Sequence, residues 1–218
     1  MDYSPLLISI KTSLLATAIA VILGIFAAYR VIKMKKFKNL IDGIFTLPLV
    51  LPPTVIGFFL LITLGKNGFI GKILSQFGTS VIFTWTATVI ASSVVAFPLV
   101  YRAAKASFEQ MDTNLIYAAQ TLGIEQRKIF FRIIMPNCRA GILSGTILAF
   151  SRAMGEFGAT IIIAGNIQGK TQTMALAVYT AIQSGDRVLA YKWVFLISSI
   201  SLLAVILMNA VSQKGDSR

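Results

Sequence analysis

Long apolar stretches alternate with short polar ones along the whole chain. A helix needs about 20 mostly apolar residues to cross the hydrocarbon core of a bilayer. Five stretches are long enough, at about residues 6–29, 44–64, 81–101, 140–164 and 193–211. The pattern therefore predicts an all-α integral membrane protein, with five transmembrane helices that form a single transmembrane domain over residues 1–218.

Basic residues are unevenly distributed between the polar segments. Short loops rich in Lys and Arg stay on the cytoplasmic side of a membrane. Thirteen basic residues fall in the first loop, the long central loop and the C-terminal tail, and five fall in the other loops. The thirteen are Arg30, Lys33, Lys35, Lys36, Lys38, Arg102, Lys105, Arg127, Lys128, Arg132, Arg139, Lys214 and Arg218. We therefore predict that the N-terminus is outside, the C-terminus is inside and the central loop lies in the cytoplasm.

Composition separates this chain from the other classes of basic protein. Hydrophobic residues make up 56% of the chain, charged residues 13%, and the mean hydropathy is +0.79, outside the usual balance of a soluble domain. A net charge of +12 would also suit a nucleic-acid binder, but such a protein gathers its basic residues on one soluble face. Here they lie between apolar segments, so we expect membrane lipid and no nucleic acid as a partner.

The residues needed for common catalytic sites are missing from the sequence. Histidine is absent, which removes histidine-based triads and zinc sites. No Gly-rich run ends in Gly-Lys-Ser or Gly-Lys-Thr, so the chain has no phosphate-binding P-loop. The single cysteine, Cys138, is expected to be a small packing residue. We expect no enzymatic activity, no metal site and no cofactor bound by this chain.

The central loop, about residues 112–136, has the pattern of two short helices. Asp112, Thr113 and Asn114 are all good N-cap residues, and apolar residues then recur at helical spacing as far as Leu122. Gly123 can adopt the left-handed conformation that ends a helix, and Pro136 is expected to end the second helix before the fourth span. The two helices would project from the membrane and dock a cytoplasmic partner, or they would lie on lipid headgroups. The pattern alone favours neither.

The second predicted span contains two adjacent prolines. Pro52 and Pro53 each remove a backbone donor and bend the helix. A kinked helix can line a cavity, with Thr54 directly beside the kink. The alternative is a packing kink that is remote from any pathway.

The central loop resembles the coupling motif of type I ABC importer permeases, which reads Glu-Ala-Ala, three residues, Gly, nine residues, Ile, any residue, Leu-Pro. The matching residues are Ala118, Ala119, Gly123, Ile133 and Pro136. Tyr117 replaces the motif's Glu, and Met135 replaces its Leu. The resemblance implies that Tyr117, Ala118, Ala119, Gly123, Ile133 and Pro136 couple the chain to a cytoplasmic ATPase.

Three further segments resemble the molybdate importer permeases: LPLVLPPTVIGFFLL at 47–61, SRAMGEFGATIIIAGNI at 151–167 and TQTMALAVYTAIQ at 171–183. Sulfate permeases share a similar Gly-Glu-Phe-Gly stretch. The resemblance implies a permease in a bacterial cytoplasmic membrane that transports molybdate, with sulfate, thiosulfate or tungstate as alternatives. It also implies a homodimer, two ATPase subunits that use ATP and Mg, and an extracytoplasmic molybdate-binding protein. The competing class is a self-contained channel or secondary carrier, which would leave the two-helix loop without a role.

Two charges lie inside the fourth predicted span. Arg152 and Glu156 are four residues apart, so on one helix they share a face and can pair. Counting about 1.5 Å per residue from Ala140 places Arg152 near the bilayer centre, where charge is costly and often functional. One interpretation is that Arg152 supports the passage of a dianion while Glu156 prevents its trapping. The other, which we favour, is a neutral pair that fixes helix packing or a kink around Gly155 and Gly158.

We assign the translocation pathway or gate to Pro52, Pro53, Thr54, Arg152, Glu156 and Gly158. The segment from Gly165 to Lys192 is too polar to span a membrane and predicts a short helix over 174–182. This segment would contribute to the outer gate and to the docking surface for the binding protein, or it would be a simple surface loop.

Overall fold

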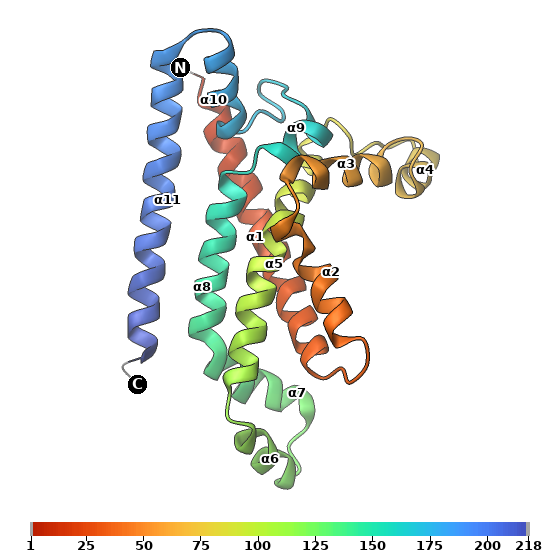
Figure 1. The fold of residues 1–218 in the computed structure, drawn as a ribbon, viewed down its shortest axis with the longest axis vertical. Coiled ribbons are helices and arrows are strands. Elements are labelled where there is room, and N and C mark those ends of the chain that lie inside the picture. The colour runs from red at the N-terminus through yellow and green to blue at the C-terminus, as the bar shows by residue number, and fades with distance from the viewer. Residues whose placement is uncertain (1, 217–218) are drawn as a thin grey trace.

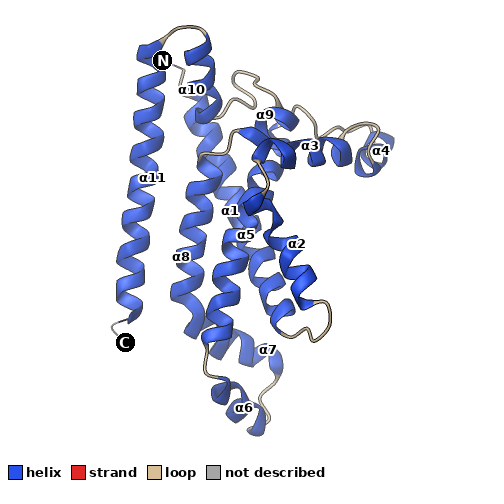
Figure 2. Ribbon diagram, viewed as in Figure 1, coloured by secondary structure: helices blue, strands red, loops and turns tan. Residues whose placement is uncertain are grey.

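The computed structural model describes residues 2–216, with side chains described as far as Leu207 and at Ala210. Two of the residues that we predict to be cytoplasmic, Lys214 and Arg218, therefore have side chains outside the described part. Over residues 2–216 the chain forms helices joined by loops, with no strand (Figure 2). The helices are α1 (Ser4–Ile32), α2 (Lys38–Val50), α3 (Pro53–Leu64), α4 (Phe69–Gln76), α5 (Trp85–Gln110), α6 (Thr113–Thr121), α7 (Gln126–Ile129), α8 (Met135–Met154), α9 (Gly158–Ala164), α10 (Met174–Gln183) and α11 (Arg187–Asp216). The predicted all-α fold is confirmed.

Four long apolar helical segments run roughly parallel and make up the bundle (Figure 1). They are Ser4–Ile32, Trp85–Gln110, Gln126–Met154 and Arg187–Leu207, each long and apolar enough to cross a membrane. Small residues fill the contact between α1, α5 and α8, where Ala16, Ala20, Ala96 and Ala149 are completely buried and pack together. Small side chains let helix backbones approach closely, which is how helices associate inside a membrane.

The second predicted span is two helices and not one kinked helix. α2 and α3 meet at an angle of 114°, and α3 and α4 leave the bundle sideways near one end of it (Figure 1). The cause is local, because Leu51 and Pro52 each precede a proline, and that position disfavours the helical conformation. Both residues are extended, with ψ of 141° and 138°. The two prolines therefore break the helix, where we had expected only a bend.

The fourth predicted span is displaced toward the central loop. It begins at Gln126 and runs to Met154, and a π-helical turn at Phe130–Ile134 joins α7 to α8. The expectation that Pro136 ends a helix is wrong, because Pro136 is the second residue of α8. Proline clashes with the carbonyl four residues earlier and lacks the N–H of the helical ladder. The wider π-helical turn directly before α8 changes this hydrogen-bond pattern, so the helix continues past Pro136.

The other predicted elements agree with the structure to within a few residues, apart from the third span, which is longer. The first span is α1, the third is α5, which continues nine residues beyond the predicted end at residue 101, and the fifth lies within α11. The short helix predicted over 174–182 is α10, which packs against α11 beside the N-terminal end of α1 (Figure 1). It is half-buried, with Met174 and Leu176 fully covered.

Candidate functional site

The central loop forms a projection at one end of the bundle, made of α6, α7 and the turn between them (Figure 1). The Asp112 carboxylate accepts a hydrogen bond from the Asn114 N–H at 2.9 Å and caps α6. At the other end of α6, Gly123 has a φ of 71°. The N–H groups of Gly123 and Ile124 donate to the carbonyls of Gln120 and Ala119 at 2.9 and 3.0 Å. These two bonds form a Schellman motif, so the predicted helix end at Gly123 is confirmed.

The predicted coupling residues differ in exposure, and two of them, Ile133 and Pro136, lie beyond the projection in the π-helical turn and α8. Ala119 is buried in a cluster that also contains Phe108, Ile129 and Ile134, and this cluster attaches the projection to the bundle. Tyr117, Ala118, Gly123 and Pro136 are exposed, and Ile133 is half-buried.

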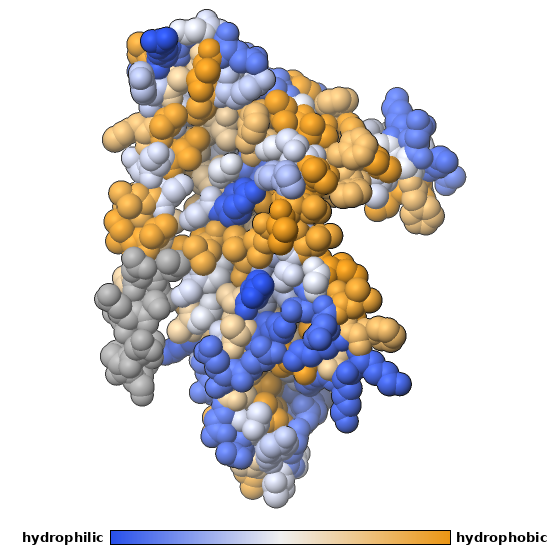
Figure 3. All heavy atoms as spheres, viewed as in Figure 1, coloured by the Kyte–Doolittle hydropathy of each residue, from blue (hydrophilic) through white to orange (hydrophobic). Residues whose placement is uncertain are grey.

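The exposed face of the projection combines apolar and basic side chains. Tyr117 is 61% exposed and Leu122 is 78% exposed. A hollow of about 400 Å³ lies beside them, lined by Gly123, Ile124, Glu125, Lys128, Arg132 and Ile133. Hydrophilic residues dominate this end of the molecule, in contrast to the apolar middle (Figure 3). An exposed apolar surface with a basic rim is typical of a protein-docking site.

Three of the predicted pathway residues lie together where α3 packs on α9. A Cβ atom added to Gly158 would lie 3.0 Å from the Pro53 Cβ and 3.2 Å from the Thr54 backbone nitrogen. A Cβ at Gly57, one turn along α3, would lie 2.9 Å from the Ala159 Cα. The two glycines therefore allow the two helix backbones to touch, which brings together segments about 100 residues apart in the sequence.

Arg152 and Glu156 form the predicted ion pair, but not on one helix. Arg152 lies in the last turn of α8, and Glu156 lies in the break before α9. The Arg152 Nη1 atom is 2.6 Å from the Glu156 Oε2 atom. The other oxygen, Oε1, accepts a hydrogen bond from the Ala159 N–H at 2.8 Å. The Glu156 side chain is only 1% exposed, and both of its oxygens hold the break between α8 and α9. The helical segment begins at Gln126 and not at Ala140. The predicted depth of Arg152, near the bilayer centre, was counted from Ala140 and therefore does not hold.

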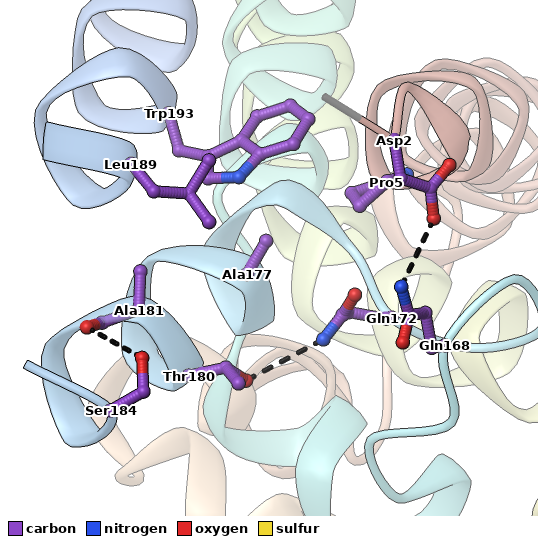
Figure 4. A pocket seen from close by; sticks show the side chains of 10 residues that line it. All are labelled: Asp2, Pro5, Gln168, Gln172, Ala177, Thr180, Ala181, Ser184, Leu189 and Trp193. Carbon is purple, nitrogen blue, oxygen red and sulfur yellow. Dashed lines mark hydrogen bonds between the residues drawn. The ribbon is translucent and has the colours of Figure 1, made fainter. Parts of the chain in front are cut away.

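A polar pocket opens at the end of the bundle opposite α6 (Figure 4). Its volume is about 280 Å³. Its lining residues are Asp2, Pro5, Gln168, Gln172, Ala177, Thr180, Ala181, Ser184, Leu189 and Trp193. Hydrogen bonds from the backbone and hydroxyl of Ser4 lower the pKa of the Asp2 carboxyl, so this carboxyl is ionised at neutral pH. Sequence reasoning missed this pocket, because its polar residues come from three separate segments.

Sequence reasoning also missed a charged cluster between α2 and α5. The Asp42 Oδ1 atom accepts a hydrogen bond from the Tyr101 hydroxyl at 2.7 Å and lies 2.9 Å from the Lys105 Nζ. One signal could have found it, because Asp42 directly precedes the second predicted span and Lys105 follows the third on the same predicted side. Within the described residues, no group of three His, Cys, Asp or Glu side chains could hold a metal ion.

Comparison with known proteins assigns the fold to a family. Residues 20–215 match the family model described as "Binding-protein-dependent transport system inner membrane component". The chain belongs to this family. It is therefore a multi-pass membrane component of a transport system, in agreement with the apolar helices and the resemblance of the central loop.

Two relatives and one solved structure show how this permease compares within the family. It is 43% identical to the molybdenum transport system permease protein ModB of Haemophilus influenzae, over all of this chain and 96% of that protein. It is 33% identical to the sulfate transport system permease protein CysW of Synechococcus elongatus, over 91% of this chain and 71% of that protein. The inward-facing MetNI methionine ABC transporter has the same fold, with a TM-score of 0.75 at 12% identity over 97% of this chain and 94% of that chain.

Proposed function

We propose that this permease is the transmembrane subunit of an ABC importer for molybdate. The observation that carries the proposal is the identity of 43% to a molybdenum permease over the full length of the chain, against 33% to a sulfate permease. Both values come from alignments over most of the chain, so the difference is not due to one shared motif. Sulfate, thiosulfate and tungstate remain the competing substrates, because an external binding protein selects the anion first.

The proposed assembly contains two copies of this chain, two cytoplasmic ATPase subunits and one extracytoplasmic molybdate-binding protein. ATP and Mg²⁺ are used by the ATPase subunits, and this chain supplies the exposed apolar surface around Tyr117 and Leu122 for their docking. A homodimer is expected because one copy of this size is too small to enclose a pathway, and a two-fold axis would place the pathway between identical surfaces.

The proposed mechanism is alternating access. The loaded binding protein docks outside, and ATP draws the ATPase pair together, so that the α6 helices of the two permeases approach each other. Movement at α6 then changes the packing at the α2–α3 and α8–α9 breaks, where Pro53 and Thr54 meet Gly158. Hydrolysis reverses the change and releases the anion inside. In this mechanism the Arg152–Glu156 pair holds the α8–α9 break and does not bind the anion.

The test is uptake by proteoliposomes that contain this chain, its ATPase and its binding protein, with molybdate, tungstate and sulfate compared. We expect ATP-dependent uptake with molybdate preferred over sulfate. A preference for sulfate would keep the importer and change its substrate. Uptake by this chain without the ATPase would instead support a channel or secondary carrier.

A further inference from the structure

Helix α2 is attached to the bundle by very few contacts. None of its 13 residues is fully buried. On α5 it meets two aromatic rings, because Phe45 lies 5.5 Å from Phe97 and 5.3 Å from Tyr101 between ring centroids. Ile41 of α2 also packs against the buried cluster that contains Tyr101. The polar links between α2 and α5 are made by Lys38 and Asp42. This matters because α2 leads directly into the α2–α3 break.

One of these polar links is built around a completely buried tyrosine. Tyr101 on α5 is 0% exposed, and its hydroxyl donates to Asp42 Oδ1 on α2 at 2.7 Å. The Lys105 ammonium lies 2.9 Å from the same oxygen, with only 17% of its side chain exposed. We refer to Asp42, Tyr101 and Lys105 as the α2–α5 clasp.

The clasp is a costly way to hold two helices together. Partly buried ion pairs contribute little to stability compared with apolar side chains of similar size. Charged groups inside membrane spans are functional candidates by default.

The clasp lies in the same packed cluster as the projection. Tyr101 belongs to the buried cluster that contains Ala119 of α6 and Ile129 of α7. Aromatic contacts continue this path, because Phe130 lies 4.6 Å from Tyr29 and 6.4 Å from Phe108 between ring centroids. Since packed interiors transmit displacement, a shift of α6 and α7 reaches Tyr101 through side chains that are already in contact.

We propose that Asp42, Tyr101 and Lys105 form a positioning site that transmits movement of the α6–α7 projection to the α2–α3 break. The clasp fixes α2 to α5, so that α2 and the prolines at its end follow the coupling helices instead of moving independently. This inference rests on the proposed importer function. The three residues act on the pathway through α2 and do not contact the transported anion.

The experiment measures molybdate taken up per ATP hydrolysed, in proteoliposomes of the complete transporter. Tyr101→Phe removes one hydroxyl and keeps the ring, and Asp42→Asn removes the charge at nearly constant shape. We expect each to lower this ratio about three- to tenfold, which is the range that corresponds to the loss of one typical hydrogen bond, while ATP hydrolysis continues. Lys105→Arg keeps the ion pair and should keep the ratio near that of the unmodified protein.

Two control variants separate the clasp from a general weakening of the protein. Tyr29→Phe also removes a hydroxyl from the aromatic cluster, but that hydroxyl accepts a hydrogen bond from Lys33 at the end of α1, and among the described residues it bonds no second helix. Glu109→Gln removes the Lys38–Glu109 pair, which joins the same two helices but has side chains 35% and 44% exposed. Both should leave the ratio unchanged.

Three results would overturn the inference. The first is an unchanged ratio in Tyr101→Phe and Asp42→Asn. The second is a loss of uptake in these variants that is matched by an equal loss of ATP hydrolysis. The third is a drop in the ratio in Glu109→Gln as large as that in the two variants. If Asp42→Asn does not assemble, Tyr101→Phe decides the test because it leaves the packing intact. Failure of the unmodified transporter to take up molybdate would instead reject the proposed function.

Discussion

Glu156 is a buried carboxylate whose two oxygens serve two different helices. One oxygen pairs with Arg152 at the end of α8, and the other accepts from the Ala159 N–H at the start of α9. The two partners are not equivalent, because Arg152 has 34% of its side chain exposed and Glu156 only 1%. Loss of Arg152 therefore leaves a buried charge without its partner, whereas loss of the Glu156 charge leaves an arginine that is partly exposed.

This asymmetry predicts unequal effects on stability. Arg152→Leu should lower the free energy of unfolding by about 3 kcal/mol, the scale for breaking a buried ion pair. Glu156→Gln should cost less, since an amide oxygen can still accept from Ala159. The double variant should be more stable than Arg152→Leu alone. Thermal unfolding of the purified protein in detergent tests the order, and a larger effect of Glu156→Gln than of Arg152→Leu would contradict it.

Gly123 is the residue on which the turn of the projection depends. Its φ of 71° lies in the left-handed region, and a Cβ there would meet no atom within 4 Å. Any effect of a substitution must therefore come from the backbone, where left-handed geometry costs a non-glycine residue about 1–2 kcal/mol.

We predict that Gly123→Val uncouples ATP hydrolysis from molybdate uptake, because a β-branched residue shifts the turn that sets the angle of α6. Gly123→Asn should retain most coupling, since asparagine tolerates this conformation. The matched control is Gly78→Val at the far end of α4, where φ is 67° and the space is also open. Uptake per ATP measures the effect, and normal coupling in Gly123→Val would disprove the role of this turn.

At the scale of elements, breaks in the helices position the candidate pathway. The α2–α3 break and the α8–α9 break lie against each other through Gly57 and Gly158. Irregular backbone at membrane depth is tolerated only where protein covers it or where it lines a cavity. The two breaks therefore meet for a physical reason, because each supplies part of the cover for the other.

Gly57 and Gly43 provide a matched test of this contact. A Cβ at Gly57 would lie 2.9 Å from both the Ala159 Cα and the Ile162 Cβ, whereas a Cβ at Gly43 would meet nothing within 4 Å. Gly57→Ala should lower the free energy of unfolding by about 1–3 kcal/mol through overpacking. Gly43→Ala should raise it by about 0.5–1 kcal/mol, because alanine is the better helix former. Thermal unfolding would reject the close contact if the two variants behave alike.

At the scale of the whole molecule, one end of the bundle carries more basic loop residues than the other. The end that holds the α1–α2 loop and the α6–α7 projection carries most of them, and the end with α4 and α10 carries few. Because basic loops are retained in the cytoplasm, we predict that the protein is oriented with the projection inside.

Cysteine labelling tests this orientation. The native Cys138 is buried, so Cys138→Ser provides a background without a reactive thiol. In that background, Ser80→Cys should react with a membrane-impermeant maleimide in intact cells, and Lys36→Cys should react only after permeabilisation. Both positions are exposed in the structure. The reverse pattern would invert the predicted topology.

The sequence by itself determined the features that depend on short stretches of chain. Apolar length predicted the first, third and fifth spans, and Gly123 predicted the end of α6. The start of α6 was narrowed to three N-cap candidates, and the spacing of Arg152 and Glu156 predicted their pairing. These features follow from local hydrophobicity, backbone preference and side-chain reach, which act over a few residues.

Tertiary structure decided what joins distant segments. The sequence could not show that Gly158 touches Pro53, that Tyr101 donates to Asp42, or that a π-helical turn lets the helix pass Pro136. Each depends on how whole helices pack, and a proline bends or breaks its helix according to what covers the freed backbone groups. Local rules give the elements of this permease, and the contacts between its helices determine which residues can act together.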